Sequence, residues 1–188
     1  MRMLGHNGGP TMEAGRAWRR FAWTKAREEL LPTLPLEVVR MRVRRARELG
    51  LDYKAYASIR AASGHDVGAL LFSSNALRVG PRAVVLPADR SERLDALKSC
   101  GRLALVHLPL AADDFAAANP VFDAAGRAPL FTDGWAAMRA AVQRLTAERG
   151  LPGDRVVLIG ETAFEREWSQ AGRLAGYIPA DRYFGAPA

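Results

Sequence analysis

The chain has 188 residues, of which 49% are hydrophobic and 25% are charged, a composition that supports a folded core and excludes disorder throughout. Its apolar runs fall far short of the roughly 20 residues of a membrane helix, and no signal-peptide core follows the first residues. A cytoplasmic protein without a membrane segment is therefore expected. The single Cys100 excludes an internal disulfide, and the three histidines leave no Cys/His set spaced for structural zinc.

The formal net charge is +7, and the whole excess lies in the first third of the chain. Residues 1–63 contain 13 basic and 6 acidic side chains, whereas residues 64–188 contain 14 of each. Such asymmetry is typical of a protein that binds nucleic acid or another acidic partner. The alternative is a basic face that is simply solvated.

The first part of the chain has helical patterns and no strand pattern. Residues 1–10 are rich in glycine and predict a flexible tail. A proline or glycine then lies within two residues of the C-terminal end of each predicted helix. The helices are expected at residues 11–31, 36–49 and 53–62.

Beyond residue 63 the pattern changes to short, continuous apolar runs, which are typical of strands buried on both faces. The predicted strands are 69–72, 83–86, 103–108 and 156–159, with a short closing strand near 176–178. Helical stretches alternate with them, at residues 91–99, 111–118, 133–149 and 162–175. This alternation predicts an α/β fold with an open, mostly parallel sheet of four or five strands and flanking helices. We therefore expect three parts: a tail (1–10), a basic three-helix region (11–63) and an α/β domain (64–188).

The first predicted helix has an arginine face with an aromatic ring in its middle. At helical spacing Arg16, Arg20 and Arg27 share one side, and Trp23 projects among them. Guanidinium groups neutralise phosphates and an aromatic ring stacks on a base, so this face suits nucleic acid. Packing of Trp23 against the sheet domain is the alternative.

The second predicted helix carries five arginines within eight positions: Arg40, Arg42, Arg44, Arg45 and Arg47. They repel one another unless anions neutralise them, and only Glu37 and Glu48 supply nearby carboxylates. A phosphate backbone would satisfy this helix better, so the five arginines are predicted phosphate contacts.

Residues 42–61 read RVRRARELGLDYKAYASIRA. Ala46, Gly50, Tyr56 and Ile59 occupy the small, turn and apolar positions of a helix-turn-helix, and Leu49 and Leu51 lie beside the turn. In this stretch the chain resembles helix-turn-helix DNA-binding proteins. The resemblance implies that the helix at 53–62 is the recognition helix, with Lys54 and Ser58 able to reach base edges. A purely structural helix corner is the alternative.

Polar residues follow the predicted strands, where ligands bind in open parallel sheets. The catalytic candidates at these strand ends are Ser73, Asn75, Asp89, His107 and Glu161. They suit an enzyme acting on a phosphorylated or nucleic-acid substrate. The alternatives are turn and cap formation for Ser73 and Asn75, and a half-buried, hydrogen-bonded histidine for His107.

No cofactor and no metal site are predicted. The chain lacks the glycine-rich phosphate loop and the dinucleotide fingerprint. Three glutamates lie close together in the sequence: Glu161, Glu165 and Glu167. At helical spacing Glu161 and Glu165 share a face while Glu167 points elsewhere, so the three do not converge on one metal ion. Carboxylates in the first turn of a helix usually complement the helix dipole.

The leading hypothesis is therefore a cytoplasmic bacterial protein that binds DNA or RNA in a regulatory role. Its α/β domain would sense a ligand, form a homodimer or bind a partner. Two alternatives remain open: the strand-end enzyme, and a protein-interaction scaffold whose arginines bind an acidic protein surface.

Overall fold

A computed structural model describes residues 34–185 of the chain. The chain divides into two compact units, residues 1–39 and 40–188. The predicted tail and first helix lie outside the described residues, and with them the predicted contacts Arg16, Arg20, Trp23 and Arg27.

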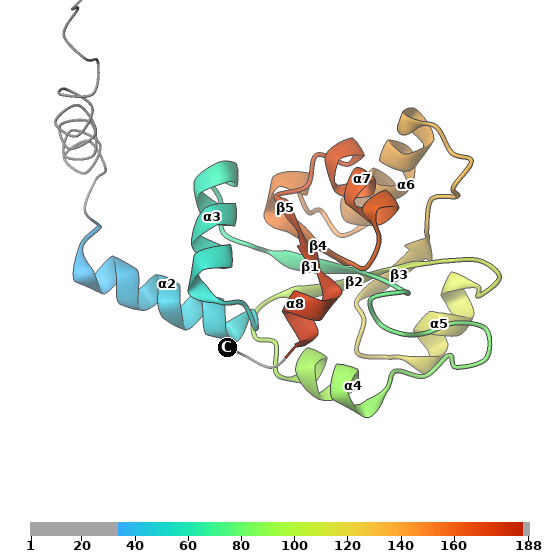
Figure 1. Ribbon diagram of the computed structural model, residues 1–188, viewed down its shortest axis with the longest axis horizontal. Helices are drawn as coiled ribbons and strands as arrows, with labels where there is room; N and C mark the ends of the chain where they lie inside the picture. Colours follow the sequence, from blue (N-terminus) through green and yellow to red (C-terminus); the bar gives the residue numbers. More distant parts are fainter. Residues whose placement is uncertain (1–33, 186–188) are drawn as a thin grey trace, which may run out of the picture. The chain divides into compact units, whose positions relative to one another are not determined.

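Five strands form one all-parallel sheet in the order β3-β2-β1-β4-β5 (Figure 1). The strands are β1 (Ala69–Ser73), β2 (Gly101–Val106), β3 (Ala124–Arg127), β4 (Val156–Gly160) and β5 (Gly176–Pro179). The predicted α/β class with an open parallel sheet is confirmed. The strand order reverses between β1 and β4, and ligands of such sheets bind at the carboxyl ends beside that reversal.

Helices flank the sheet in the described part of the chain. They are α2 (Leu36–Glu48), α3 (Tyr53–Ser63), α4 (Ala88–Asp95), α5 (Ala112–Ala118), α6 (Trp135–Glu148), α7 (Ala163–Ala171) and α8 (Ala180–Phe184). Each overlaps a helix predicted from the sequence except α8, which follows β5 where no helix is expected. α4 covers residues 88–95 instead of the predicted 91–99. None of the helices in residues 34–185 is long and apolar enough to cross a bilayer.

Side chains alternate between the two faces of the sheet and build two separate core clusters. On one face Leu70 and Phe72 pack with residues of α3, α4, α5 and α8. On the other face Leu71 packs with residues of α6 and α7, including Trp168, which is fully buried. Figure 1 shows these two helical layers around the sheet.

Residues 40–63 share their core with the sheet. Ala46, Leu49, Tyr56 and Ile59 belong to the same buried cluster as Phe72. The helix corner between α2 and α3 is therefore held in a fixed position on the α/β fold, which matters for any surface that it presents.

The predicted strand at 83–86 is wrong, and an unexpected strand forms at β3. Val85 is 66% exposed, and the Asn119 side chain bonds the neighbouring backbone: Nδ2 donates to Val84 O and Oδ1 accepts from Leu86 N. An amide side chain thus satisfies the backbone groups that a sheet neighbour would otherwise pair. β3 reads AAGR, which contains no apolar run to signal a strand.

Candidate functional site

The corner between α2 and α3 begins with a glycine-dependent helix end. Gly50 has a φ of +64°, its N–H donates to Arg47 O, and Leu51 N donates to Ala46 O. This pattern closes α2 with a left-handed residue, for which glycine has no side-chain penalty. Asp52 then caps α3, because its carboxylate accepts from Ala55 N at 2.7 Å.

The apolar side chains of the corner are buried. Leu49 is fully buried, and Tyr56 is 1% exposed. Tyr56 fits because its hydroxyl donates to Asp66 Oδ1 at 2.8 Å. Partial burial acts to raise the pKa of Asp66, but the Tyr56 hydrogen bond and the Arg45 charge lower it overall.

Arg45 is an internal anchor rather than a free basic side chain. Its Nε donates to Asp66 Oδ2 at 3.0 Å, and its Nη1 donates to Glu48 Oε2 at 3.2 Å. The guanidinium also donates to three backbone carbonyl oxygens, those of Val67, Lys98 and Ser99, each at 3.0 Å. All five donors of the side chain are used, so none is left for a phosphate.

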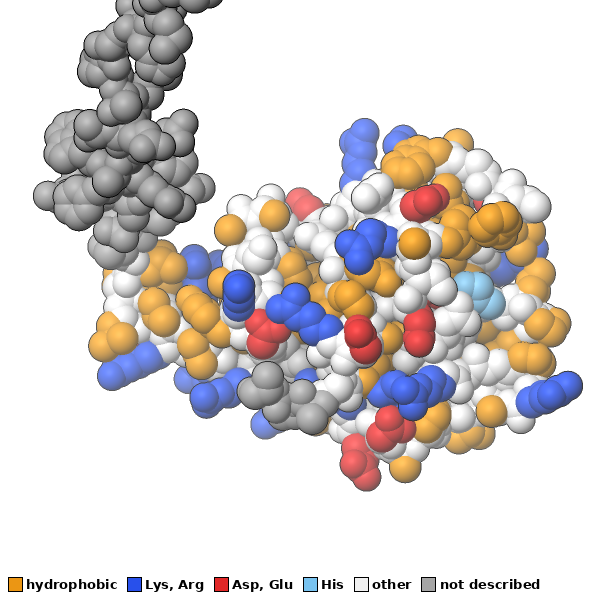
Figure 2. Space-filling model, in the orientation of Figure 1, with side chains coloured by type: hydrophobic (Ala, Val, Ile, Leu, Met, Phe, Trp, Pro, Cys, Tyr) orange, Lys and Arg blue, Asp and Glu red, His pale blue; other side chains and the backbone are white. Residues whose placement is uncertain are grey.

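Arg44 and Arg47, in contrast to Arg45, are available on the surface of α2. Both side chains are exposed, and within the described residues neither forms an ion pair. They share one helix face with the exposed Arg40, because the three follow the spacing i, i+4 and i+7. Arg42 is half-buried. Figure 2 shows basic side chains along α2, among apolar ones.

The predicted recognition helix α3 exposes Lys54 and Ser58. They lie four residues apart and therefore on one face, next to the face of the buried Ala55 and Ile59. Arg60, by contrast, points to the Asp66 carboxylate, with Nη1 at 3.7 Å from Oδ1. The exposed part of α3 therefore contributes one cation.

A second cluster of polar side chains lies at the carboxyl ends of β1 and β2. Ser74 Oγ is 2.8 Å from His107 Nδ1 and also accepts from the His107 backbone N–H. On the other side of the ring, His107 Nε2 is 3.6 Å from Glu165 Oε1. Glu165 is fully buried, and its oxygens accept from Asn75 Nδ2 at 2.9 Å and from two backbone N–H groups, those of Glu161 and Thr162.

Both ring nitrogens of His107 therefore face protein groups. Burial lowers the pKa of His107 more than the Glu165 carboxylate raises it, so the imidazole is neutral at pH 7. Trp168 covers the ring at a centroid distance of 5.2 Å. The arrangement joins β1, β2 and α7 around a His107 side chain that is 29% exposed.

The other predicted catalytic residues take separate positions. Ser73 is fully buried and its Oγ accepts from Ala76 N, as a turn-forming serine does. Asp89 lies on α4 and pairs with Arg90 at 3.2 Å. Glu161 is exposed, and only its backbone N–H joins the Glu165 network.

The sequence places Ser74 at the strand end, between the catalytic candidates Ser73 and Asn75, but does not assign Glu165 to the strand-end cluster. The signal for Glu165 is present, because Thr162 and Glu165 form a reciprocal capping box at the start of α7. A capping glutamate is usually exposed, so the pattern does not reveal its burial against His107. Within residues 34–185 no group of three or more His, Cys, Asp or Glu side chains is placed to hold a metal ion.

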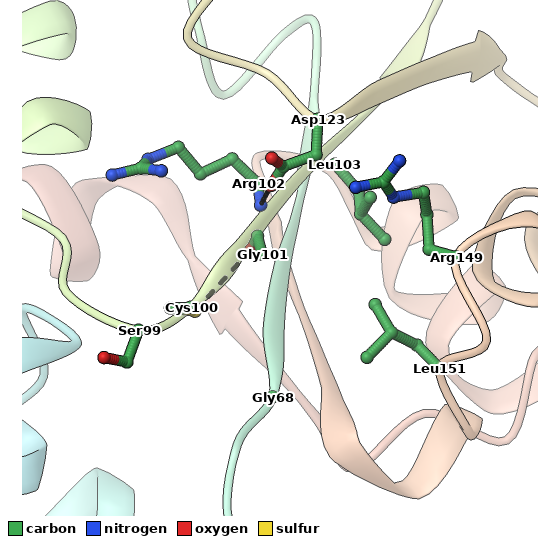
Figure 3. Close-up of a pocket in the computed structure, with 9 residues that line it drawn as sticks. All are labelled: Gly68, Ser99, Cys100, Gly101, Arg102, Leu103, Asp123, Arg149 and Leu151. Carbon is green, nitrogen blue, oxygen red and sulfur yellow. Dashed lines mark hydrogen bonds between the residues drawn. The ribbon is translucent and has the colours of Figure 1, made fainter.

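A cavity of about 420 Å³ lies at the opposite, amino ends of β1 and β2 and includes Cys100 in its wall. Figure 3 shows that Arg102 and Arg149 extend on opposite sides of β2 there. The Arg102 guanidinium donates to Leu94 O and Leu97 O. Burial raises the pKa of Cys100 to about 11, so the thiol is not a nucleophile at neutral pH.

No protein-family model matches the chain, and neither the curated proteins nor the solved structures contain a significant match to it. The function must therefore be inferred from the residues themselves.

Proposed function

We propose that the protein binds nucleic acid through the exposed arginine face of α2, with α3 beside it. The observation that carries this proposal is that Arg44 and Arg47 are exposed on one helix face and form no ion pair within the described residues. Unpaired guanidinium groups at this spacing suit a phosphate backbone, whose contacts release counterions. Arg45 takes no part in this surface.

The rigid attachment of α2 supports the same proposal. Arg45 ties the helix to Asp66 and to the loop before β2, while Leu49 and Ala46 are buried in the core. A fixed helix presents its cations without the ordering cost that a mobile segment incurs on binding. The resemblance of residues 42–61 to helix-turn-helix proteins makes duplex DNA the first ligand to test, with Lys54 and Ser58 facing the bases.

The strand-end enzyme is the weaker alternative. Ser74 is 2% exposed, and the ring nitrogens of His107 face Ser74 and Glu165. A general base needs a nitrogen within hydrogen-bond reach of the substrate proton. The same contacts link α7 to the carboxyl ends of β1 and β2, which gives the cluster a structural role.

Binding to duplex DNA, single-stranded DNA and RNA tests the proposal, with the variants Arg44→Gln and Arg47→Gln. Each variant is expected to weaken binding of every sequence to a similar extent, because a phosphate contact carries no sequence information. Lys54→Gln is expected to change the preference among duplex sequences. The matched control is Arg144→Gln, another exposed arginine, which lies on α6 at the opposite face of the sheet.

Three outcomes distinguish the proposal from its alternatives. Loss of affinity in the α2 variants but not in the control supports the proposal. Equal affinity of Arg44→Gln, Arg47→Gln and the Arg144→Gln control contradicts it. Absence of any nucleic-acid binding at low salt, together with capture of an acidic protein that depends on Arg44 and Arg47, replaces it with the scaffold alternative.

A further inference from the structure

A cavity of about 770 Å³ lies beside the helix corner, between α2, the start of α3, α4 and α8. Its size falls within the range of small-molecule sites. Apolar groups contribute part of the wall, with Val43 from α2, Leu51 from the turn and Tyr53 from α3. These apolar residues suit the hydrocarbon body of a ligand.

The charged side chains in the wall leave a positive excess of one. Arg47, Arg93 and Arg182 face the cavity together with Asp52 and Asp181. Arg182 Nη2 pairs with Asp52 Oδ2 at 2.9 Å, so these two charges neutralise each other. The α3-capping hydrogen bond from Ala55 is the main reason that the pKa of Asp52 is lowered, and the Arg182 contact adds to it, so Asp52 is ionised at neutral pH.

Two of the arginines lack a carboxylate partner within the described residues. Arg93 donates through Nη2 to Gly50 O at 2.7 Å and to Tyr183 O at 3.2 Å, and its Nε is buried without a hydrogen-bond partner. Arg47 is exposed and forms no ion pair within residues 34–185. The wall is therefore positive at Arg93, and Arg47 has donors free for a ligand.

We propose that this cavity binds a small monocarboxylate with an apolar body, held by the Arg47 guanidinium. The guanidinium fork matches a carboxylate with two parallel hydrogen bonds. A single negative charge balances the excess of one, whereas a dianion would leave an unbalanced charge near Asp52 and Asp181. The apolar body lies against Val43, Leu51 and Tyr53.

The cavity is linked to the helix corner that carries the proposed nucleic-acid surface. Arg93 bonds Gly50 O in the turn, and the Tyr183 hydroxyl donates to Leu49 O at 3.2 Å. A carboxylate on Arg47 neutralises one of the two cations proposed to contact phosphates, so the ligand lowers nucleic-acid affinity. By linkage the nucleic acid lowers carboxylate affinity by the same factor. This regulatory step rests on the proposed function, whereas the ligand site does not.

The experiment titrates the full chain with phenylacetate, hexanoate and octanoate, each beside its neutral amide, and follows backbone ¹H–¹⁵N shifts. We expect at least one carboxylate to bind about tenfold more tightly than its amide, with shifts at Leu51 and Tyr53. Arg47→Gln is expected to weaken carboxylate binding by about three- to tenfold. Arg44→Gln is the matched control, because Arg44 is exposed on the same helix face but does not line the cavity.

The ligand site is overturned if no carboxylate binds at up to about 10 mM, or if acid and amide bind equally. It is also overturned if the shifts map to the cavity at the amino ends of β1 and β2. Equal carboxylate affinity of Arg47→Gln and Arg44→Gln overturns it as well. Addition of the binding carboxylate to a nucleic-acid complex tests the regulatory step. Release of nucleic acid supports that step, and an unchanged affinity refutes it. Carboxylate binding by a chain that binds no nucleic acid supports the ligand site and refutes only the proposed function.

Discussion

Replacing Arg45 with methionine removes the anchor of α2 and keeps its aliphatic stem. The substitution deletes five hydrogen bonds, two to the carboxylates of Asp66 and Glu48 and three to backbone carbonyls. The Arg45 side chain is 16% exposed, so its carbonyl partners are only partly reached by water after its removal.

The expected loss in the free energy of unfolding is about 2–4 kcal/mol. Hydrogen bonds to a charged group contribute roughly 1.5–3 kcal/mol each, but five bonds of one side chain are not additive. Water also solvates the carboxylates that lose Arg45, because the Asp66 side chain is 44% exposed and that of Glu48 is 32% exposed. This solvation reduces the loss in the free energy of unfolding.

Urea unfolding followed by circular dichroism measures this loss, with Arg44→Met as the matched control. Arg44 is exposed and unpaired within the described residues, so the control is expected to stay within about 0.5 kcal/mol of the parent. Equal stability of the two variants would refute the assignment of Arg45 as an anchor.

The same contact gives a pH dependence. The folded-state pKa of Asp66 is below its ordinary value, so its stabilising contribution is present above about pH 4 and is lost as the pH falls through the folded-state pKa. The parent should therefore lose more stability between about pH 5 and pH 3 than Asp66→Asn. An equal loss in both proteins would contradict the Asp66 contact.

Three further predictions test other parts of the fold. Gly64→Ala, at φ +77° with open space around it, should lower the free energy of unfolding by about 1 kcal/mol. Gly50→Ala should lower it by at least about 1 kcal/mol more, because its new Cβ lies 3.1 Å from Arg93 Nε. Thermal unfolding measures both losses. Glu165→Gln places an amide NH₂ among N–H donors and should cost about 2–3 kcal/mol in urea unfolding, against about 0.5 kcal/mol or less for the exposed Glu167→Gln. Cys100 should react with Ellman's reagent at pH 8 far more slowly than glutathione does, because burial raises the pKa of its thiol to about 11; a rate equal to that of glutathione would contradict the buried site.

The sequence was sufficient for the elements whose signal is local. The apolar runs of β1, β2 and β4 and the glycine ends of α2 and α3 identify those elements directly. β3 is an edge strand of three small residues and an arginine, so its pairing with β2 follows from the sheet and not from its own composition. The segment 83–86 has a strand-like pattern, yet Asn119, a residue distant in sequence, determines its backbone bonding.

In the candidate site, too, local sequence patterns are predictable and contacts between distant residues are not. The arginine run of α2 indicated a basic surface, but it gave no means of separating Arg45 from Arg44. The partners of Arg45 lie at Asp66 and in the loop at 98–99, far along the chain. Glu165 likewise reads as an ordinary capping residue, and only the fold brings it to His107. Partners distant in sequence decide which charged residues remain available to a ligand.

Nucleic-acid binding through α2 is tested most directly by the slope of log affinity against log salt concentration for duplex DNA. We predict that affinity falls steeply with salt, and that the slope is reduced by about 1 in Arg44→Gln and in Arg47→Gln but unchanged in Arg144→Gln. Affinity that is indifferent to salt, or slopes equal in all four proteins, would contradict it.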